Sequence, residues 1–76
     1  MFVKILTKRH KHIIREHIYE CENVAVIPDG DNVKVKMEDT EGVEKEVAVP
    51  FEGQISIYLM NQQGKTIDTF RFGTKT

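Results

Sequence analysis

Apolar and polar residues alternate along most of the chain between residues 24 and 72. Four short turn-like stretches interrupt the alternation, and each closes on a glycine: Gly30, Gly42, Gly53 and Gly64. An alternation of period two is typical of strands with one buried face, and glycine suits tight turns because it adopts positive φ without strain. We therefore expect positive φ at all four glycines. The pattern predicts five strands, near residues 24–28, 31–39, 43–50, 54–61 and 65–72.

The lengths of the turns determine which residues lie opposite each other in neighbouring strands. A two-residue turn at residues 29–30 sets Val24 opposite Val35. Three-residue loops that close at residues 42 and 53 set Val47 opposite Val35 and Ile57. The sequence therefore predicts a five-stranded antiparallel meander over about residues 24–72 with one apolar face. Two rows of side chains cross that face: Val24, Val35, Val47 and Ile57 in one, and Val26, Val33, Val49 and Ile55 in the other.

Residues 1–23 must supply the cover for this apolar face, because no other segment is left. A helix near residues 8–21 is one interpretation, since Ile14, Ile18 and Cys21 would share a face. The charge order disfavours it: lysines and arginines would crowd the positive end of the helix dipole and glutamates the negative end. We therefore predict an all-β fold in which an N-terminal hairpin, with strands near 2–7 and 12–20, covers the meander and closes a small barrel or a two-layer sandwich. An α+β fold with that one helix is the alternative.

The size and composition of the chain fit one small domain over residues 1–76, with room for one modest core. Cys21 is the single cysteine, so an internal disulfide is excluded. The chain starts without a basic region followed by a long apolar stretch, and no apolar run approaches the roughly 20 residues that span a bilayer. We expect a cytoplasmic protein that does not enter the membrane.

The charge distribution is uneven although the formal net charge is only −1. Residues 1–15 contain five of the 11 basic residues and none of the 12 acidic residues, so this segment carries +5 and the rest of the chain −6. Such a cluster can contact nucleic-acid phosphates weakly and without reading bases, and it can equally be the solvated tip of a hairpin. The candidate phosphate-binding residues are Lys8, Arg9, Lys11 and Arg15.

No constellation of residues predicts catalysis or metal binding. The three histidines and Cys21 match no closed zinc pattern, and the segment 29–32 is too short for a calcium loop. The chain contains neither a glycine-rich phosphate loop between a strand and a helix nor a serine in a nucleophile elbow. We therefore expect a protein that is not an enzyme and that needs no metal or cofactor.

The strand near residues 54–61 carries no charge, and at one end both of its faces are apolar. The loop that closes at residue 64 sets Leu59 opposite Ile67. In that register four large apolar side chains gather on the outer side of the last two strands: Tyr58, Met60, Phe70 and Phe72. Such a patch is either a second core under the N-terminal hairpin or an interaction surface. A bulge in the last strand could also turn Phe70 or Phe72 inward.

The aromatic patch favours a non-catalytic module for protein–protein interaction or self-assembly. The partner is then another protein or a second copy of the chain, bound through Tyr58, Met60, Phe70 and Phe72 or through an open strand edge. Weak nucleic-acid binding through the basic hairpin tip is the alternative function. Sheet-based binders of single strands place aromatic residues among positive charges, whereas Asp68 lies beside this patch on the acidic part of the chain.

Overall fold

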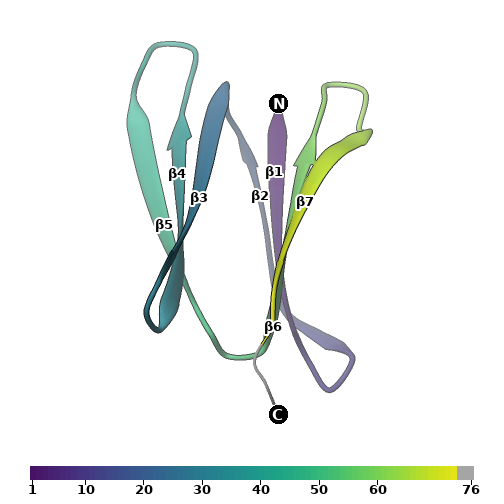
Figure 1. The fold of residues 1–76 in the computed structure, drawn as a ribbon. Coiled ribbons are helices and arrows are strands. Elements are labelled where there is room, and N and C mark those ends of the chain that lie inside the picture. Colours follow the sequence, from purple (N-terminus) through teal and green to yellow (C-terminus); the bar gives the residue numbers. More distant parts are fainter. Residues whose placement is uncertain (74–76) are drawn as a thin grey trace.

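In a computed structural model, the regular structure of the chain consists of antiparallel strands (Figure 1). The structure describes residues 1–73, so the last three residues of the predicted domain lie outside the described part. The helix considered for residues 8–21 is absent, and the predicted N-terminal hairpin is confirmed. The strands are β1 (Phe2–Arg9), β2 (His12–Glu20), β3 (Asn23–Asp29), β4 (Asn32–Glu38), β5 (Glu44–Pro50), β6 (Gln54–Met60) and β7 (Thr66–Phe72).

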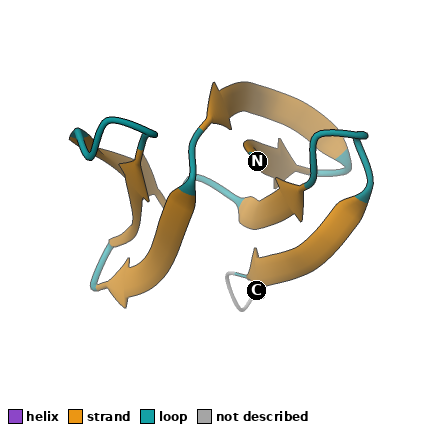
Figure 2. Ribbon diagram, turned by 90° about the horizontal axis from the view of Figure 1, so that it is seen from above, coloured by secondary structure: helices purple, strands orange, loops and turns teal. Residues whose placement is uncertain are grey.

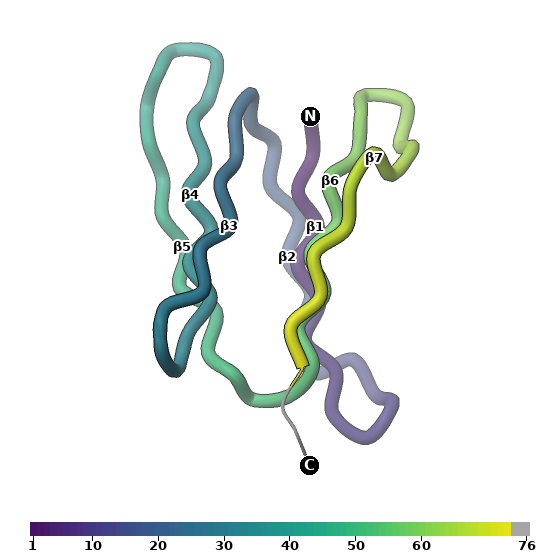
Figure 3. Tube along the Cα trace, in the orientation of Figure 1, coloured from purple at the N-terminus to yellow at the C-terminus, as the bar shows by residue number. Residues whose placement is uncertain are grey.

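The seven strands form two sheets rather than a closed barrel. The four-stranded sheet has the order β2-β1-β6-β7, and the three-stranded sheet has the order β3-β4-β5. Figures 1 and 2 show the two sheets as separate layers. The chain crosses between the layers twice, between β2 and β3 and again in the segment that follows β5, as the tube in Figure 3 shows. The prediction of an all-β fold is therefore confirmed. Of the two arrangements that it left open, the two-layer one agrees with the structure and the closed barrel does not.

The predicted five-stranded meander is also wrong, because β5 does not pair with β6. β6 pairs instead with β1, so that Ile57 lies opposite Ile5 rather than opposite Val47. Gly53 explains the difference, since it lacks the positive φ that the expected loop requires. A Cβ atom at this position would collide with the backbone carbonyl of Lys8. Gly53 therefore permits the close approach of β1, and the chain leaves the three-stranded sheet here.

Within the three-stranded sheet, one predicted register is confirmed and the other is displaced by two residues. Val35 lies opposite Val47 across β4 and β5, as the loop ending at Gly42 predicts. Across β3 and β4, however, Val35 lies opposite Val26 and not Val24. The two-residue turn consists of Gly30 and Asp31, one position later than expected. A displacement by two residues keeps the same side chains on the buried face.

The hairpin of β6 and β7 contains a bulge close to its turn. Farther from the turn than the bulge, the side chains of β7 project from the side of the sheet opposite to the one predicted. Next to the turn, Met60 lies opposite Thr66, which agrees with the predicted loop. The register then shifts by one residue, and Ile57 lies opposite Phe70. Phe70 and Phe72 consequently pack against the core. Their expected position beside Tyr58 on the outer side is wrong, and the bulge is the reason.

One apolar core lies between the two sheets and takes side chains from both. Large side chains in it, such as Ile57 and Val35, have no exposed surface. Gly30, Gly42 and Gly64 have the predicted positive φ, of 59°, 80° and 81°. The buried members of the core are Val3, Ile5, Cys21, Val33, Val35, Met37, Val49, Ile55, Ile57 and Leu59.

Candidate interaction surfaces

The side of the four-stranded sheet that points away from the core, here called the outer face, carries three rows of side chains. Residues opposite each other in antiparallel strands project from the same side of a sheet, so the observed register defines these rows. The rows alternate with the core residues of β1 and β6, such as Ile5 and Ile57. From β2 toward β7 they read Glu20, Phe2, Met60 and Thr66; then Ile18, Lys4, Tyr58 and Thr69; then Glu16, Leu6, Ser56 and Arg71.

Large apolar side chains lie around Lys4 on the two central strands of the outer face. Leu6 is only 6% exposed and yet does not belong to the core cluster between the sheets. Phe2, Tyr58 and Met60 are partly buried around it, and Ile18 is 56% exposed. Within residues 1–73 no strand lies over this side of the sheet (Figure 1). The outer face therefore presents large apolar side chains to the surroundings.

Tyr58 lies among polar groups on this face. The pKa of its phenol is below the ordinary value, mainly because the Ser56 hydroxyl can donate a hydrogen bond to the phenolate. Burial opposes this effect, and the positive charges of Arg71 and Lys8 add to it. The phenolic oxygen consequently has polar neighbours, while the ring belongs to the apolar centre of the face.

Two members of this surface, Tyr58 and Met60, agree with the prediction from the sequence, whereas Phe2, Leu6 and Ile18 were not predicted. A signal for them exists in β1, where apolar residues occupy adjacent positions at Phe2 and Val3 and again at Ile5 and Leu6. A strand that is apolar on both faces needs cover on both sides. The predicted position of the hairpin, over the meander and not beside β6, concealed this signal.

A second candidate surface is a groove at the tip of the hairpin formed by β1 and β2. The turn consists of His10 and Lys11, whose φ angles of 51° and 68° lie in the left-handed region. This conformation costs most residues other than glycine about 1–2 kcal/mol each. The groove has a volume of about 640 Å³, and four consecutive residues of the tip line it, Lys8 to Lys11, together with Phe51 to Gln54.

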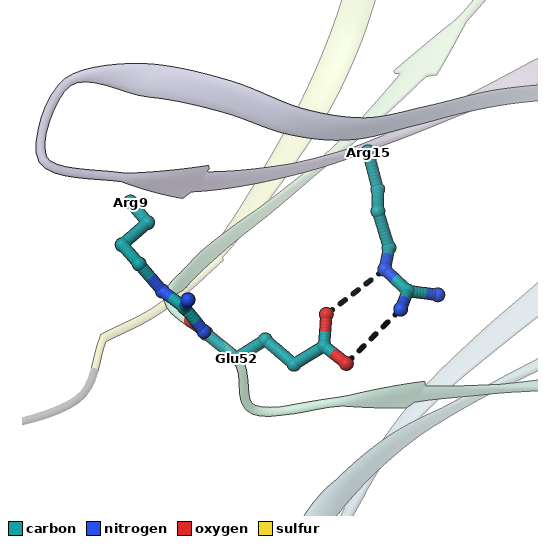
Figure 4. Close-up of polar contacts among 3 residues, drawn as sticks. All are labelled: Arg9, Arg15 and Glu52. Carbon is teal, nitrogen blue, oxygen red and sulfur yellow. Dashed lines mark hydrogen bonds and ion pairs between the residues drawn. The ribbon is translucent and has the colours of Figure 1, made fainter.

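Glu52 connects this tip to the segment between the two sheets (Figure 4). Its carboxylate accepts a hydrogen bond from Nη2 of Arg15 at 3.0 Å and lies 2.9 Å from Nε of the same side chain. Nε of Arg9 donates to the backbone carbonyl of Glu52 at 2.8 Å. Of the four predicted phosphate-binding residues, Arg15 is thus neutralised by Glu52. Lys8, Arg9 and Lys11 line the groove.

The residues considered for metal binding or nucleophilic chemistry do not assemble into a site. Cys21 is a core residue, and burial raises the pKa of its thiol above the ordinary value. A thiol that stays protonated at neutral pH is a poor nucleophile. In the described part of the chain, no three His, Cys, Asp or Glu side chains lie close enough together to hold a metal ion. Nor does this part contain a helix that is long and apolar enough to cross a membrane.

Comparisons of the chain with protein-family models, with curated proteins and with solved structures found no significant match. The functional argument therefore depends on the two surfaces described above.

Proposed function

We propose that the protein is a non-catalytic module for protein–protein interaction and self-assembly, and that the outer face is its contact surface. The observation that carries this proposal is the group of large apolar side chains on an uncovered side of the four-stranded sheet. Its members are Phe2, Leu6, Ile18, Tyr58 and Met60. Phe70 and Phe72 are not part of the proposed contact, because they pack against the core.

Physical arguments support a contact surface rather than an ordinary solvent-exposed face. An antiparallel sheet with one solvated face normally alternates apolar and polar residues. Contiguous exposed apolar patches on small proteins mark binding sites, and aromatic residues and methionine are enriched in interfaces. Charged residues, such as Glu16 and Arg71, flank the apolar centre on both edge strands. An apolar centre with a polar rim is the usual anatomy of an interface.

The double substitution of Tyr58→Asp with Met60→Lys tests this function. The wild-type protein should show a mass above that of the monomer in sedimentation equilibrium as its concentration rises from about 10 μM to about 1 mM. This range covers the dissociation constants that are expected for small interfaces. The double variant should remain a folded monomer, because a charge in the centre of the contact is desolvated on binding.

A matched control makes the same charge changes on the outer side of the three-stranded sheet, as Ile27→Asp with Ala48→Lys. Both residues are exposed and lie on either side of Lys34. This control should associate like the wild type. Circular dichroism of both variants reports the folded state. Loss of the fold in the outer-face variant alone would show that Tyr58 and Met60 are structural, and the proposal would then be wrong.

Weak phosphate contact through the hairpin tip is a second candidate function, favoured by the three cations that line the groove. Since Arg15 is engaged by Glu52, three phosphates at most are neutralised, and log affinity should fall by about 2.7 per log unit of salt. Titration of labelled oligonucleotides with the wild type and with a variant carrying alanine at Lys8, Arg9 and Lys11 measures this slope. Binding that survives moderate salt and discriminates between sequences would contradict simple phosphate contact.

A further inference from the structure

We propose that the partner of the outer face is a second copy of this chain, bound face to face about a twofold axis that runs parallel to the strands. This inference names the partner in the proposed function and rests on it. The axis lies between the two copies, over the middle of the sheet where β1 and β6 are paired. Rotation about it places β2 of one copy over β7 of the other, and β1 over β6. Each of the three rows then faces the same row of the second copy.

The residues of the rows are complementary in this arrangement. Glu16 at one end of its row meets Arg71 at the other end of the same row in the second copy. The two side chains belong to opposite edge strands, roughly 14 Å apart across three strand spacings, so they cannot pair within one chain. Twofold symmetry produces this contact twice in each dimer.

The central strands are complementary as well. Phe2 of one copy faces Met60 of the other, and a thioether beside an aromatic ring is a favourable contact. Lys4 faces the ring of Tyr58, where a cation can lie over the aromatic face. These contacts lie on the two central strands, and the opposite charges of Glu16 and Arg71 lie on the edge strands, where an interface usually has a polar rim.

The charges also select the direction of the axis. A twofold axis in the same plane but perpendicular to the strands would place β2 over β2 and reverse the order of the rows. Glu16 would then face Glu20 of the second copy, and Lys4 would face Lys4. Like charges that face each other across an interface cost several kcal/mol. Only the axis parallel to the strands pairs opposite charges at both edges of the sheet.

The size of the face limits the affinity. Four strands about 4.8 Å apart and three rows about 6.8 Å apart give a projected area of roughly 400 Å² per copy. A standard interface buries about 800 Å² per partner. The dimer should therefore dissociate with a Kd in the micromolar range or above, and its population should depend on concentration.

Charge reversal of the two rim residues tests this geometry. The variants E16R and R71E should each have a Kd for self-association at least about 10-fold above that of the wild type, because each variant brings like charges together twice in a dimer. An equimolar mixture of the two variants should form a heterodimer about as tightly as the wild type, since both contacts then pair opposite charges. The double variant E16R/R71E should likewise recover self-association.

Sedimentation equilibrium of each variant and of the mixture provides the masses, and circular dichroism confirms that each variant is folded. The control variant is E44R, in which an exposed glutamate is reversed on the outer side of the other sheet. E44R should associate like the wild type. Recovery of the dimer in the mixture depends on contacts between chains, so a structural effect of either substitution cannot produce it.

The outcomes separate this inference from the function on which it rests. If the Tyr58 and Met60 double variant becomes monomeric while E16R and R71E associate normally, the outer face is the contact but the proposed axis is wrong. If all three variants associate like the wild type, another surface such as the open edge of β2 carries the contact, and both proposals fall. A wild type that stays monomeric to about 1 mM would overturn the homodimer.

Discussion

The three-stranded and four-stranded sheets both bury one face in the same core, but their outer sides are built differently. On the three-stranded sheet, Nζ of Lys34 lies 3.1 Å from Asp29 and 3.7 Å from Glu46, and Lys36, Glu38 and Glu44 lie on the same side. On the four-stranded sheet the corresponding side carries Phe2, Leu6, Tyr58 and Met60 at its centre. Position on an outer side therefore does not by itself require apolar residues. This difference between the two outer sides is the basis of the contact proposed for the four-stranded sheet.

The two sheets also differ in how they are assembled along the sequence. The three-stranded sheet uses consecutive strands joined by short turns. The four-stranded sheet joins the first two strands to the last two, and its central pair, β1 and β6, brings Ile5 opposite Ile57. Closing a long loop must precede such a pairing. The outer face can form only when the two ends of the chain meet.

The largest expected effect tests whether the two sheets depend on each other. Ile57 and Val35 are fully buried on opposite sides of the core. Ile57→Ala should lower the free energy of unfolding by about 3–4 kcal/mol and Val35→Ala by about 2–3 kcal/mol, through lost transfer energy and the cavities left behind.

Urea unfolding followed by circular dichroism measures both losses. Because one core joins the sheets, each variant should unfold in a single transition like that of the wild type. Ile67→Ala is the control, since this side chain is 58% exposed and its removal should change the free energy by less than about 0.5 kcal/mol. Separate transitions for the two sheets would contradict this expectation, because each sheet would then be stable without the other.

The same contrast explains how much of the fold the sequence predicts. The pairing of Val35 with Val47 follows from alternation and the length of one loop, both of which are local. The pairing of Ile5 with Ile57 is not local, and the turn-like stretch at Gly53 resembles a hairpin loop. What distinguishes Gly53 is its contact with the backbone of Lys8, which lies far away in the sequence.

The residues of the candidate surfaces were predictable only where the local sequence determines their positions. Tyr58 and Met60 were identified because they belong to one uncharged strand. Phe70 was misplaced because a bulge of one residue reverses the face of a strand, and nothing in the local sequence fixes the position of the bulge. The engagement of Arg15 by Glu52 joins residues 37 positions apart, so it required the structure.

The next largest effect concerns the crossing between the two sheets. Gly53→Ala should lower the free energy of unfolding by about 2 kcal/mol or more, because the added Cβ would force β1 away from the segment that follows β5. Gly64→Ala is the matched control. That glycine has a φ of 81° but no atom within 4 Å of an added Cβ, so the loss should be about 1 kcal/mol. Chemical denaturation measures both. A loss at Gly53 no larger than the loss at Gly64 would show that the close approach does not hold the crossing in place.

A smaller effect of opposite sign is expected at the hairpin tip of the four-stranded sheet. Replacing His10 by Asn and Lys11 by Gly should raise the free energy of unfolding by about 1 kcal/mol, since Asn-Gly is the preferred pair where both turn residues have positive φ. In the three-stranded sheet Gly30 already occupies a turn position with positive φ, and Gly30→Ala should lower stability by about 1 kcal/mol. Thermal unfolding compares the two. A loss of stability in the tip variant would mean that the side chains of His10 and Lys11 make stabilising contacts that exceed the strain of their backbone.

The smallest effect contrasts the two outer sides by titration. The pKa of Tyr58 is lowered from 10.0, chiefly through Ser56, so the native state loses this proton at a lower pH than the unfolded chain does. Its contribution to stability therefore grows as pH rises through the native pKa and is complete above 10.0. The pKa of Lys34 is raised from 10.5, first by its hydrogen bond with Asp29. Its contribution is complete below 10.5 and is lost as pH rises through the native pKa.

Both contributions should be small because the two groups are exposed to solvent screening. The tyrosine shift is the more direct to observe, by ultraviolet absorbance between pH 8 and 12, roughly the range that brackets ordinary phenol ionisation. Tyr58→Phe should remove the native step that lies at a lower pH than the titration in urea, and Tyr19→Phe should leave that step in place. Repeating the titration at rising protein concentration also probes the dimer, because contact with a second copy would change the surroundings of Tyr58 and thereby shift its pKa. In dilute native protein, Tyr58 could instead lose its proton at the same pH as in urea or at a higher pH. That result would show that Ser56 and Arg71 do not stabilise the phenolate.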